Sequence, residues 1–230
     1  MVQHQMPLDD AVRKGLPWES GEKSIKTFWE TAKLILRSPT EAFGMVKRDG
    51  GMLAPMMFAI AGGLVGALFS AVYGSIRIVI FGFMAANVGE GPEMAAGAGM
   101  LVLLIVLQFG MALAGGTVGV VIGLFMSSAI YHVVLMMLRG ANYPFEATFA
   151  VVAYVTGATS LIQVVPLCGK YVYGIVAMVY AIIGLSAVQK ISGGKAAAAV
   201  LLPGLICGVL IVLLIGVAVF FAFTAGAGGF

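Results

Sequence analysis

The side chains that could do chemistry in this sequence form two short polar stripes within otherwise apolar segments. The first stripe comes shortly before Arg139, and the second follows Glu146. Their members carry hydroxyl, imidazole or amide groups: Ser127, Ser128, Tyr131 and His132 in the first stripe, and Thr156, Thr159, Ser160 and Gln163 in the second. Such groups can hydrogen-bond across a pair of helices, or they can line a path for a solute or a proton.

Neither stripe contains a catalytic or cofactor-binding pattern. The two histidines, His4 and His132, are far apart, and the two cysteines are isolated. Residues 191–196, "ISGGKA", look like part of a phosphate-binding loop. However, Val188 stands where that motif needs its first glycine, and Ala196 stands where Ser or Thr would hold magnesium. We therefore expect no enzymatic activity, no bound metal and no cofactor.

The composition places the chain in a membrane. It has 230 residues, of which 61% are hydrophobic and 10% charged, whereas soluble domains have about 45–50% apolar and about 25% charged residues. Fifteen of the 23 charged side chains lie in the first 50 residues. We expect a polar segment over residues 1–50, followed by an all-α, polytopic membrane bundle over residues 51–230. The small net charge of +3 gives no reason to expect a nucleic-acid partner.

Five segments are long and apolar enough to cross a bilayer, which takes about 20 residues of helix. They are residues 55–80, 99–138, 145–166, 171–188 and 196–223. A loop over residues 85–97 separates the first two segments and contains Glu90 and Glu93 but no Lys or Arg.

The second segment is long enough for two spans, so the distribution of charge decides the topology. With five spans and the N-terminus inside, the inner side has eight N-terminal bases plus Arg139, Lys190 and Lys195, against Lys170 outside. With six spans those three residues move outside, which leaves nine inside and three outside. Cytoplasmic loops are enriched in Lys and Arg. We therefore expect five spans, a kink or break at Gly115–Gly116, and a cytoplasmic N-terminus in a bacterial inner or plasma membrane.

The polar N-terminal segment divides into two parts. Residues 1–23 contain Pro7, Gly15 and Pro17 and should be mostly irregular. Residues 24–50 should form two cytoplasmic helices. The second helix should run from Pro39 to about Arg48, because Ser38, Pro39 and Glu41 have the spacing of a capping box with proline in the first turn.

The first of these two helices should be strongly amphipathic. Its apolar face consists of Ile25, Phe28, Trp29, Ala32, Ile35 and Leu36, and its other side of Lys26, Glu30, Lys33 and Arg37. A helix of this kind beside a membrane domain lies in the interface, or it packs against the cytoplasmic ends of the bundle. Both arrangements can hold at once.

Glycines at four-residue spacing recur within the predicted spans. The sets are Gly62/Gly66, Gly115/Gly119/Gly123 and Gly204/Gly208. Such spacing allows close helix contact, either within one chain or in a homo-oligomer.

The stretch between the second and third spans, "RGANYPFEATF" over residues 139–149, reads as a cytoplasmic hairpin. Gly140 should end one helix, and Pro144 should begin or precede the next. Glu146 should then lie in the first turn, where a negative charge suits the helix dipole.

This stretch and the sequence after it resemble the Yip domain family of five-span membrane proteins, which are named for interaction with Ypt/Rab GTPases. "LMMLRGANYPFEATFAVVAY" and "VVPLCGKYVYGIVAMVYAIIGLSAVQKISGGKAAAAVLLP" carry the resemblance, and "SPTEAFGMVKRDGG" is similar to the prokaryotic branch. The resemblance covers about residues 25–215. The matching motif residues are Arg139, Gly140, Phe145, Thr148, Tyr154 and Pro166.

The resemblance implies five spans and a cytoplasmic N-terminus, and for eukaryotic members it implies vesicle traffic, Rab binding and membrane shaping. The N-terminal segment here is short and lacks the Asp-Leu-Tyr-Gly-Pro motif of that branch, which argues against a Rab-type partner. We expect a non-enzymatic scaffold or membrane-organising factor that contacts the lipid bilayer and binds other proteins. The alternative is a transporter of a small solute or lipid, with its polar site between the second and third spans.

Overall fold

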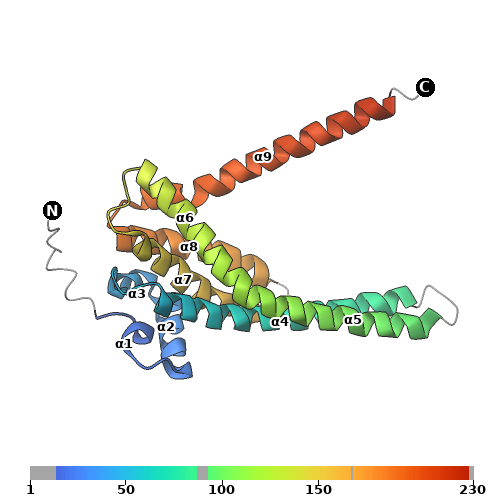
Figure 1. The fold of residues 1–230 in the computed structure, drawn as a ribbon, viewed down its shortest axis with the longest axis horizontal. Helices are drawn as coiled ribbons and strands as arrows, with labels where there is room; N and C mark the ends of the chain where they lie inside the picture. Colours follow the sequence, from blue (N-terminus) through green and yellow to red (C-terminus); the bar gives the residue numbers. More distant parts are fainter. Residues whose placement is uncertain (1–13, 87–92, 167, 228–230) are drawn as a thin grey trace.

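The computed structural model describes residues 14–86, 93–166 and 168–227, and within these ranges every regular element is helical (Figure 1). The elements before the third span are α1 (Pro17–Ser20), α2 (Ile25–Arg37), α3 (Pro39–Met45), α4 (Leu53–Ala86), α5 (Glu93–Ala114), the π-helical turn η1 (Gly115–Gly119) and α6 (Val120–Met137). The remaining elements are α7 (Phe145–Ser160), the 3-10 turn η2 (Leu161–Val164), α8 (Gly169–Gln189) and α9 (Gly193–Ala227). The predicted all-α class is confirmed.

Among the described residues, five helical segments are long and apolar enough to cross a membrane. They are Leu53–Met84, Gly99–Met137, Phe145–Val164, Gly169–Gln189 and Gly193–Val219. These segments correspond one to one with the predicted spans, so the prediction of five spans is confirmed. Part of the predicted loop over residues 85–97 is helical, because α4 continues to Ala86 and α5 begins at Glu93; residues 87–92 lie outside the described ranges.

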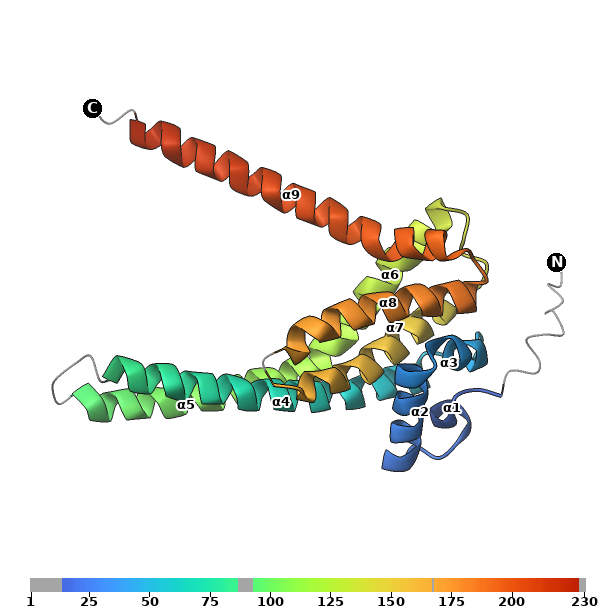
Figure 2. The same cartoon turned by 180° about the vertical axis from the view of Figure 1, so that it is seen from behind.

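The long second span bends without breaking. The predicted kink at Gly115–Gly116 is a π-helical turn over Gly115–Gly119 that joins α5 directly to α6. An inserted π turn is a known cause of helix bending. Both views show that α5 runs alongside α4, whereas α6 turns away from α4 (Figures 1 and 2). The turn packs closely on α4, since a Cβ built on Gly116 would lie 3.1 Å from the Ala67 side chain.

Helix α7 forms the centre of the bundle, because α4, α6, α8 and α2 all pack against it. Nearly all of its residues are buried. The closest approach joins α7 to α4, where a Cβ on Gly62 would lie 2.1 Å from the Gly157 carbonyl oxygen. Gly66 likewise faces Ser160 and Gln163. The Gly62/Gly66 pair therefore mediates a contact within the chain, whereas Gly115, Gly119, Gly123, Gly204 and Gly208 have open space beside them.

Within the predicted irregular segment over residues 1–23, the described residues 14–23 contain one short helix, α1, over residues 17–20; residues 1–13 lie outside the described ranges. Trp18 holds this helix in place, because its indole N–H donates to the Ala54 carbonyl oxygen at 2.8 Å and its backbone N–H donates to Thr31 Oγ1 at 2.9 Å. Its ring also packs edge-on against Phe58. The tertiary contacts of one buried aromatic residue therefore stabilise a helix that the local sequence does not predict.

The short helix α3 begins at Pro39 as predicted, but the capping box is absent. Ser38 makes no side-chain cap. The reason is that Ser38 already ends α2, with its backbone N–H bonded to the Leu34 carbonyl oxygen at 2.8 Å. Helix α3 also ends at Met45, short of the expected Arg48.

Helix α9 leaves the bundle after its first turns. Its N-terminal part contacts α6 and α8, and Figures 1 and 2 show the rest of the helix extending away from both. The large apolar side chains from Leu201 to Val219 are exposed. A membrane is the medium in which such a helix is stable.

Candidate functional site

A buried glutamine joins the hairpin between α6 and α7 to the end of α8. Gln189 is fully buried, and its Oε1 accepts the Tyr143 backbone N–H at 2.8 Å. Its Nε2 donates to the Tyr143 carbonyl oxygen at 3.2 Å and to Thr148 Oγ1 at 3.0 Å. Asn142 Nδ2 donates to the Gln189 carbonyl oxygen at 2.8 Å. The hairpin and the α8 terminus are thus fastened by both backbone and side-chain bonds.

The same network reaches α6 through a histidine. His132 Nδ1 and Thr148 Oγ1 are 2.9 Å apart, and the donor depends on the imidazole tautomer. The His132 ring also packs edge-on against Phe145. Three spanning segments are therefore connected through Thr148, which takes part in bonds to α6 and α8 from its position on α7.

A buried arginine connects the N-terminal layer, which consists of α1, α2, α3 and the residues up to the start of α4, to this site. Arg48 is 4% exposed, and its Nε donates to the Val188 carbonyl oxygen at 2.8 Å. The guanidinium lies 3.8 Å from the centroid of the Tyr143 ring. A cation at the C-terminus of α8 is favoured by the helix dipole, and its stacking on Tyr143 adds a cation–π contact. We call Arg48, Asn142, Tyr143, Thr148 and Gln189 the polar clamp.

Two basic residues, one shortly after α6 and one directly after α8, adopt the left-handed conformation. Arg139 has φ 49° and Lys190 has φ 50°. The prediction that Gly140 ends α6 is wrong, because the helix ends earlier. Helix α6 ends at Met137, and Gly140 follows the left-handed residue and donates its N–H to the Leu135 carbonyl oxygen at 2.7 Å. That bond pattern requires positive φ one residue earlier.

The second half of the hairpin follows the prediction. Pro144 directly precedes α7, and Glu146 lies in its first turn. Lys195 Nζ donates to the Arg139 carbonyl oxygen at 3.3 Å, so the first turn of α9 touches the hairpin.

Ser128 and Thr156, which lie at similar distances along the chain from the hairpin, do not hydrogen-bond to each other. Ser128 is fully buried, but its Oγ has no hydrogen-bond partner among the described residues. The cross-helix bond lies nearer the hairpin, between His132 and Thr148. Continuing that antiparallel register places Ser128 opposite Val152, one turn away from Thr156. Equal distance from the hairpin along two helices gives equal depth only where the helix axes are parallel, and α6 crosses the bundle (Figure 1).

The other members of the two polar stripes do not meet in one place. Thr159 Oγ1 and Ser160 Oγ each bond back to a carbonyl four residues earlier in α7, both at 2.7 Å. Gln163 lies against Gly66 of α4. Ser127 and Tyr131 are half-buried on α6. Of the eight predicted residues, His132 hydrogen-bonds to a side chain of another span, Thr148 of α7.

The family-like motif residues, in contrast, concentrate around the polar clamp and the core beneath it. Thr148 belongs to the clamp, and Phe145 contacts His132. Tyr154 is fully buried, with its ring 5.2 Å from that of Phe58. Pro166 follows η2 at the opposite end of the third span. Sequence reasoning missed Arg48, Tyr143 and Gln189; the interruption of an apolar run by Asn142 and Tyr143 was the available signal.

The amphipathic helix α2 has its apolar positions divided between two environments. Ala32 and Ile35 are fully buried against the bundle, and Phe28 packs on the same core. Ile25 and Trp29 are 89% and 59% exposed. Helix α2 therefore packs on the bundle through one set of apolar side chains and leaves another set exposed for the membrane interface.

A half-buried carboxylate, Glu19, joins α1 to the segment that follows α3. Burial raises the pKa of Glu19, although its bonds from the backbone N–H groups of Leu16 and Lys47 partly offset that rise. The Tyr154 hydroxyl lies beside this carboxylate but outside hydrogen-bonding geometry. Docking α1 therefore places an acidic group in a setting that favours its protonated form.

Docking of α1 should depend on pH. A raised pKa in the docked state means that the docked segment binds a proton more tightly than the free one. Docking should be strongest below the ordinary value of 4.5 and should weaken as the pH rises through the raised value. In a Trp29→Phe variant Trp18 is the sole tryptophan, so its emission should shift to longer wavelength over that range. Glu19→Gln should remove the shift, and an unchanged shift in that variant would assign it to another group.

The described residues contain five membrane-spanning segments, of which the third is buried among α4, α6 and α8, and they define a multi-pass α-helical integral membrane protein. Comparison with family models identifies which kind. The Yip1 domain matches residues 33–223, most of the chain, and the protein therefore belongs to the Yip1 domain family. Searches of curated proteins and of solved structures found no match.

Proposed function

We propose that this protein is a non-enzymatic scaffold that organises the membrane and binds other proteins, with α2 lying in the cytoplasmic interface. The exposed pair Ile25 and Trp29 carries the proposal. Tryptophan is enriched at membrane interfaces, and a four-residue spacing puts both side chains on the same side of α2. Exposed Lys26 and Lys33 continue along the neighbouring surface of the helix, where they would meet lipid headgroups.

The position of α2 supports this proposal. Both views show α2 running across the end of the bundle, while the spans run away from it (Figures 1 and 2). Tyr180 of α8 donates its hydroxyl to the Leu36 carbonyl oxygen at 2.8 Å, which fixes the C-terminal end of the helix. A helix held in this way is oriented along the membrane surface, with its N-terminal half available for lipid.

We place this end of the bundle in the cytoplasm. Contacts join the N-terminal layer, the hairpin and the turn between α8 and α9 into one end, as Arg48 and Lys195 show. Exposed Arg139, Lys190 and Lys195 therefore lie on the same side as the basic N-terminal segment, and such a side faces the cytoplasm. For a bacterial protein this would be the inner or plasma membrane.

The transporter alternative gains no support from the region between α6 and α7. Leu124, Phe149 and Val152 form a packed apolar cluster there. A path for a solute would require that cluster to open. A Rab-type partner likewise gains no support from the described residues of the N-terminal layer.

The proposal is tested with the full chain in proteoliposomes made with lipids brominated near the headgroup. Trp29 should be quenched strongly, and the Trp29→Phe variant should lose most of that quenching because Trp18 is only 6% exposed. Crosslinking in native membranes followed by purification should recover the same protein partner repeatedly. The double variant Ile25→Asp, Trp29→Asp should reduce both signals. Unquenched Trp29 would refute the interfacial role, and the absence of any captured protein would refute the scaffold.

A further inference from the structure

Helix α2 presents its side chains in an order that bears on which lipids it can bind. Successive residues of an α-helix are rotated by about 100°, so the direction of each side chain follows from its position. Phe28, Ala32 and Ile35 point toward the bundle, on which they pack. The exposed side chains of Ile25 and Trp29 point about 90° away from them. One side of α2 therefore faces the protein, and the next side around the helix is exposed to meet lipid.

The charged residues of α2 continue in the same direction of rotation. Exposed Lys33, Lys26 and Arg37 lie about 40°, 60° and 80° beyond Trp29. Exposed Glu30 lies about 100° beyond it. The apolar pair is therefore flanked first by positive charge, and the negative charge lies farthest from it. We call Lys26, Lys33 and Arg37 the basic stripe.

The charges of the basic stripe are directed to the surroundings of the protein. No hydrogen bond or ion pair joins any of its members to another described residue. Lysine and arginine lay their hydrocarbon stems along apolar surface and keep the charged end in a polar layer. With Trp29 at the membrane interface, the basic stripe therefore places its charges among the headgroups.

The depth of α2 matches that of an interfacial helix. The ring of Phe28 lies 4.8 Å from the ring of Phe58, measured between centroids. The first spanning segment begins at Leu53, and Phe58 lies about 8 Å along it. Interfacial helices bury their apolar face about 5–10 Å into the boundary between headgroups and acyl chains. This depth favours a lipid surface over an acidic protein as the occupant of the basic stripe.

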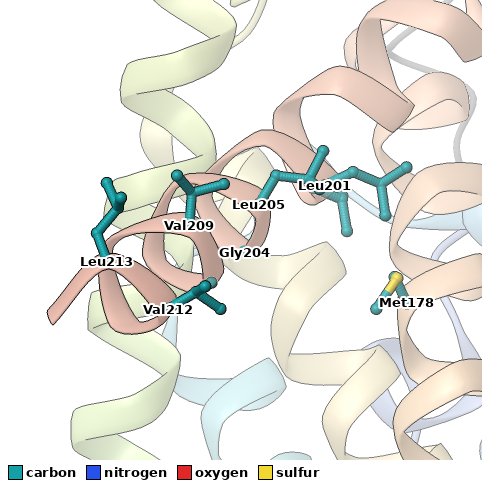
Figure 3. A pocket seen from close by; sticks show the side chains of 9 residues that line it. Met178, Leu201, Gly204, Leu205, Val209, Val212 and Leu213 are labelled. Carbon is teal, nitrogen blue, oxygen red and sulfur yellow. The ribbon is translucent and has the colours of Figure 1, made fainter. Parts of the chain in front are cut away.

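A groove between α8 and α9 shows the contrast with a purely apolar surface (Figure 3). It is lined by Met178 of α8 and by side chains of α9 that include Leu201, Leu205 and Val209, and every lining residue is apolar or glycine. Such a surface contacts the hydrocarbon chains of lipids, which are alike whatever headgroup they carry. Selection among headgroups requires charge beside the apolar surface, as on α2.

We propose that the basic stripe enriches anionic phospholipids around α2. This inference deepens the function proposed above, since it rests on the interfacial position of α2. The cytoplasmic leaflet carries the negative surface charge that the basic stripe would meet. Each basic residue near such a surface favours binding by about fivefold, and the attraction falls off within a Debye length. The preference should therefore be strong at low ionic strength and should disappear in high salt.

The test uses the full chain in symmetric liposomes that contain phosphatidylcholine and phosphatidylglycerol in one fixed ratio. Either the phosphatidylglycerol or an equal amount of the phosphatidylcholine is brominated close to the headgroup, and the emission of Trp29 is measured in both preparations. The Trp29→Phe variant gives the contribution of Trp18, the other tryptophan of the chain. Quenching should correspond to an enrichment of phosphatidylglycerol of about fivefold at low ionic strength.

Variants assign the preference to the basic stripe. Lys33→Gln alone should lower it, and the triple variant Lys26→Gln, Lys33→Gln, Arg37→Gln should make quenching by the two lipids equal. Glu30→Gln should raise it, because the negative charge of α2 is removed. Lys170→Gln is the matched control for Lys33→Gln. It makes the same change at an exposed lysine in the first turn of α8, at the opposite end of the bundle, and should leave the preference unchanged.

The outcomes separate this inference from the function on which it rests. Equal quenching of Trp29 by the two lipids in the wild-type chain would overturn the inference and leave the interfacial position of α2 intact. An acidic protein as the occupant gives that result, because the liposomes contain no other protein. Trp29 that neither lipid quenches would instead refute the interfacial position. An equal loss of preference in Lys170→Gln and Lys33→Gln would also overturn the inference, since the net charge of the chain would then explain it.

Discussion

Gly62→Ala should destabilise the membrane domain more than any other addition of a single methyl group to α4 or α9. The added Cβ would lie 2.1 Å from the Gly157 carbonyl oxygen and 2.7 Å from its Cα. These are backbone atoms and cannot rotate away, so α4 and α7 must separate. Forced overpacking costs about 1–3 kcal/mol and occasionally more, and we expect the upper end of that range.

The measurement is unfolding of the purified chain in mixed micelles with increasing sodium dodecyl sulfate, followed by circular dichroism. Gly216→Ala is the matched control, because it makes the same chemical change in another spanning helix where nothing lies within 4 Å of the new Cβ. Alanine favours helix over glycine by about 1 kcal/mol, so the control should be neutral or slightly stabilising. Equal stability of the two variants would show that the α4–α7 contact is looser than the structure has it.

The spans were predictable because their signals are local. Apolar length and the segregation of charge follow directly from the sequence, and both are set by the solvent around each helix. The bend at Gly115–Gly116 was predictable for the same reason. Its form, a π turn that keeps the helix continuous, was not, because it depends on how closely Gly116 packs against Ala67 of α4.

The candidate site was less predictable because its contacts depend on how helices cross. The sequence identifies His132 and Thr148 separately, yet the bond between them requires the tilt of α6 over α7. A shift of one helical turn separates Ser128 from Thr156, although both lie at similar distances along the chain from the hairpin. Gln189 and Arg48 gave no periodic signal at all. Gln189 bonds to a backbone group of Tyr143, and Arg48 bonds to the Val188 carbonyl oxygen. Each partner is distant in sequence from the residue it bonds to.

The residue motifs that resemble the family also become intelligible in these terms. The hairpin sequence supplies Asn142, Tyr143 and Thr148, and each of them bonds to Gln189. The hairpin sequence therefore cannot be replaced freely by another connection between the two spans. It fixes the relative position of α6, α7 and α8, and with Arg48 it also fixes the N-terminal layer that orients α2.

Among substitutions of the polar-clamp residues, Gln189→Leu should therefore be the most damaging. It removes the partner of the Tyr143 N–H and carbonyl oxygen and one partner of Thr148 Oγ1, all at a fully buried side chain. Each buried polar group left without a partner costs about 1–3 kcal/mol. We expect a loss of about 3 kcal/mol in micelle unfolding. Hydrogen exchange should also accelerate at the Tyr143 amide, because the hairpin is no longer fastened to α8.

Gln108→Leu is the matched control, since Gln108 is half-buried and its Nε2 donates to the Ala71 carbonyl oxygen at 3.2 Å. It should cost clearly less and should leave exchange at Tyr143 unchanged. The double variant Gln189→Leu, Thr148→Val should be less damaging than the sum of the two single variants, because both remove the same hydrogen bond. Additive losses would mean that Gln189 and Thr148 stabilise the bundle independently, and the polar clamp would then not act as a unit.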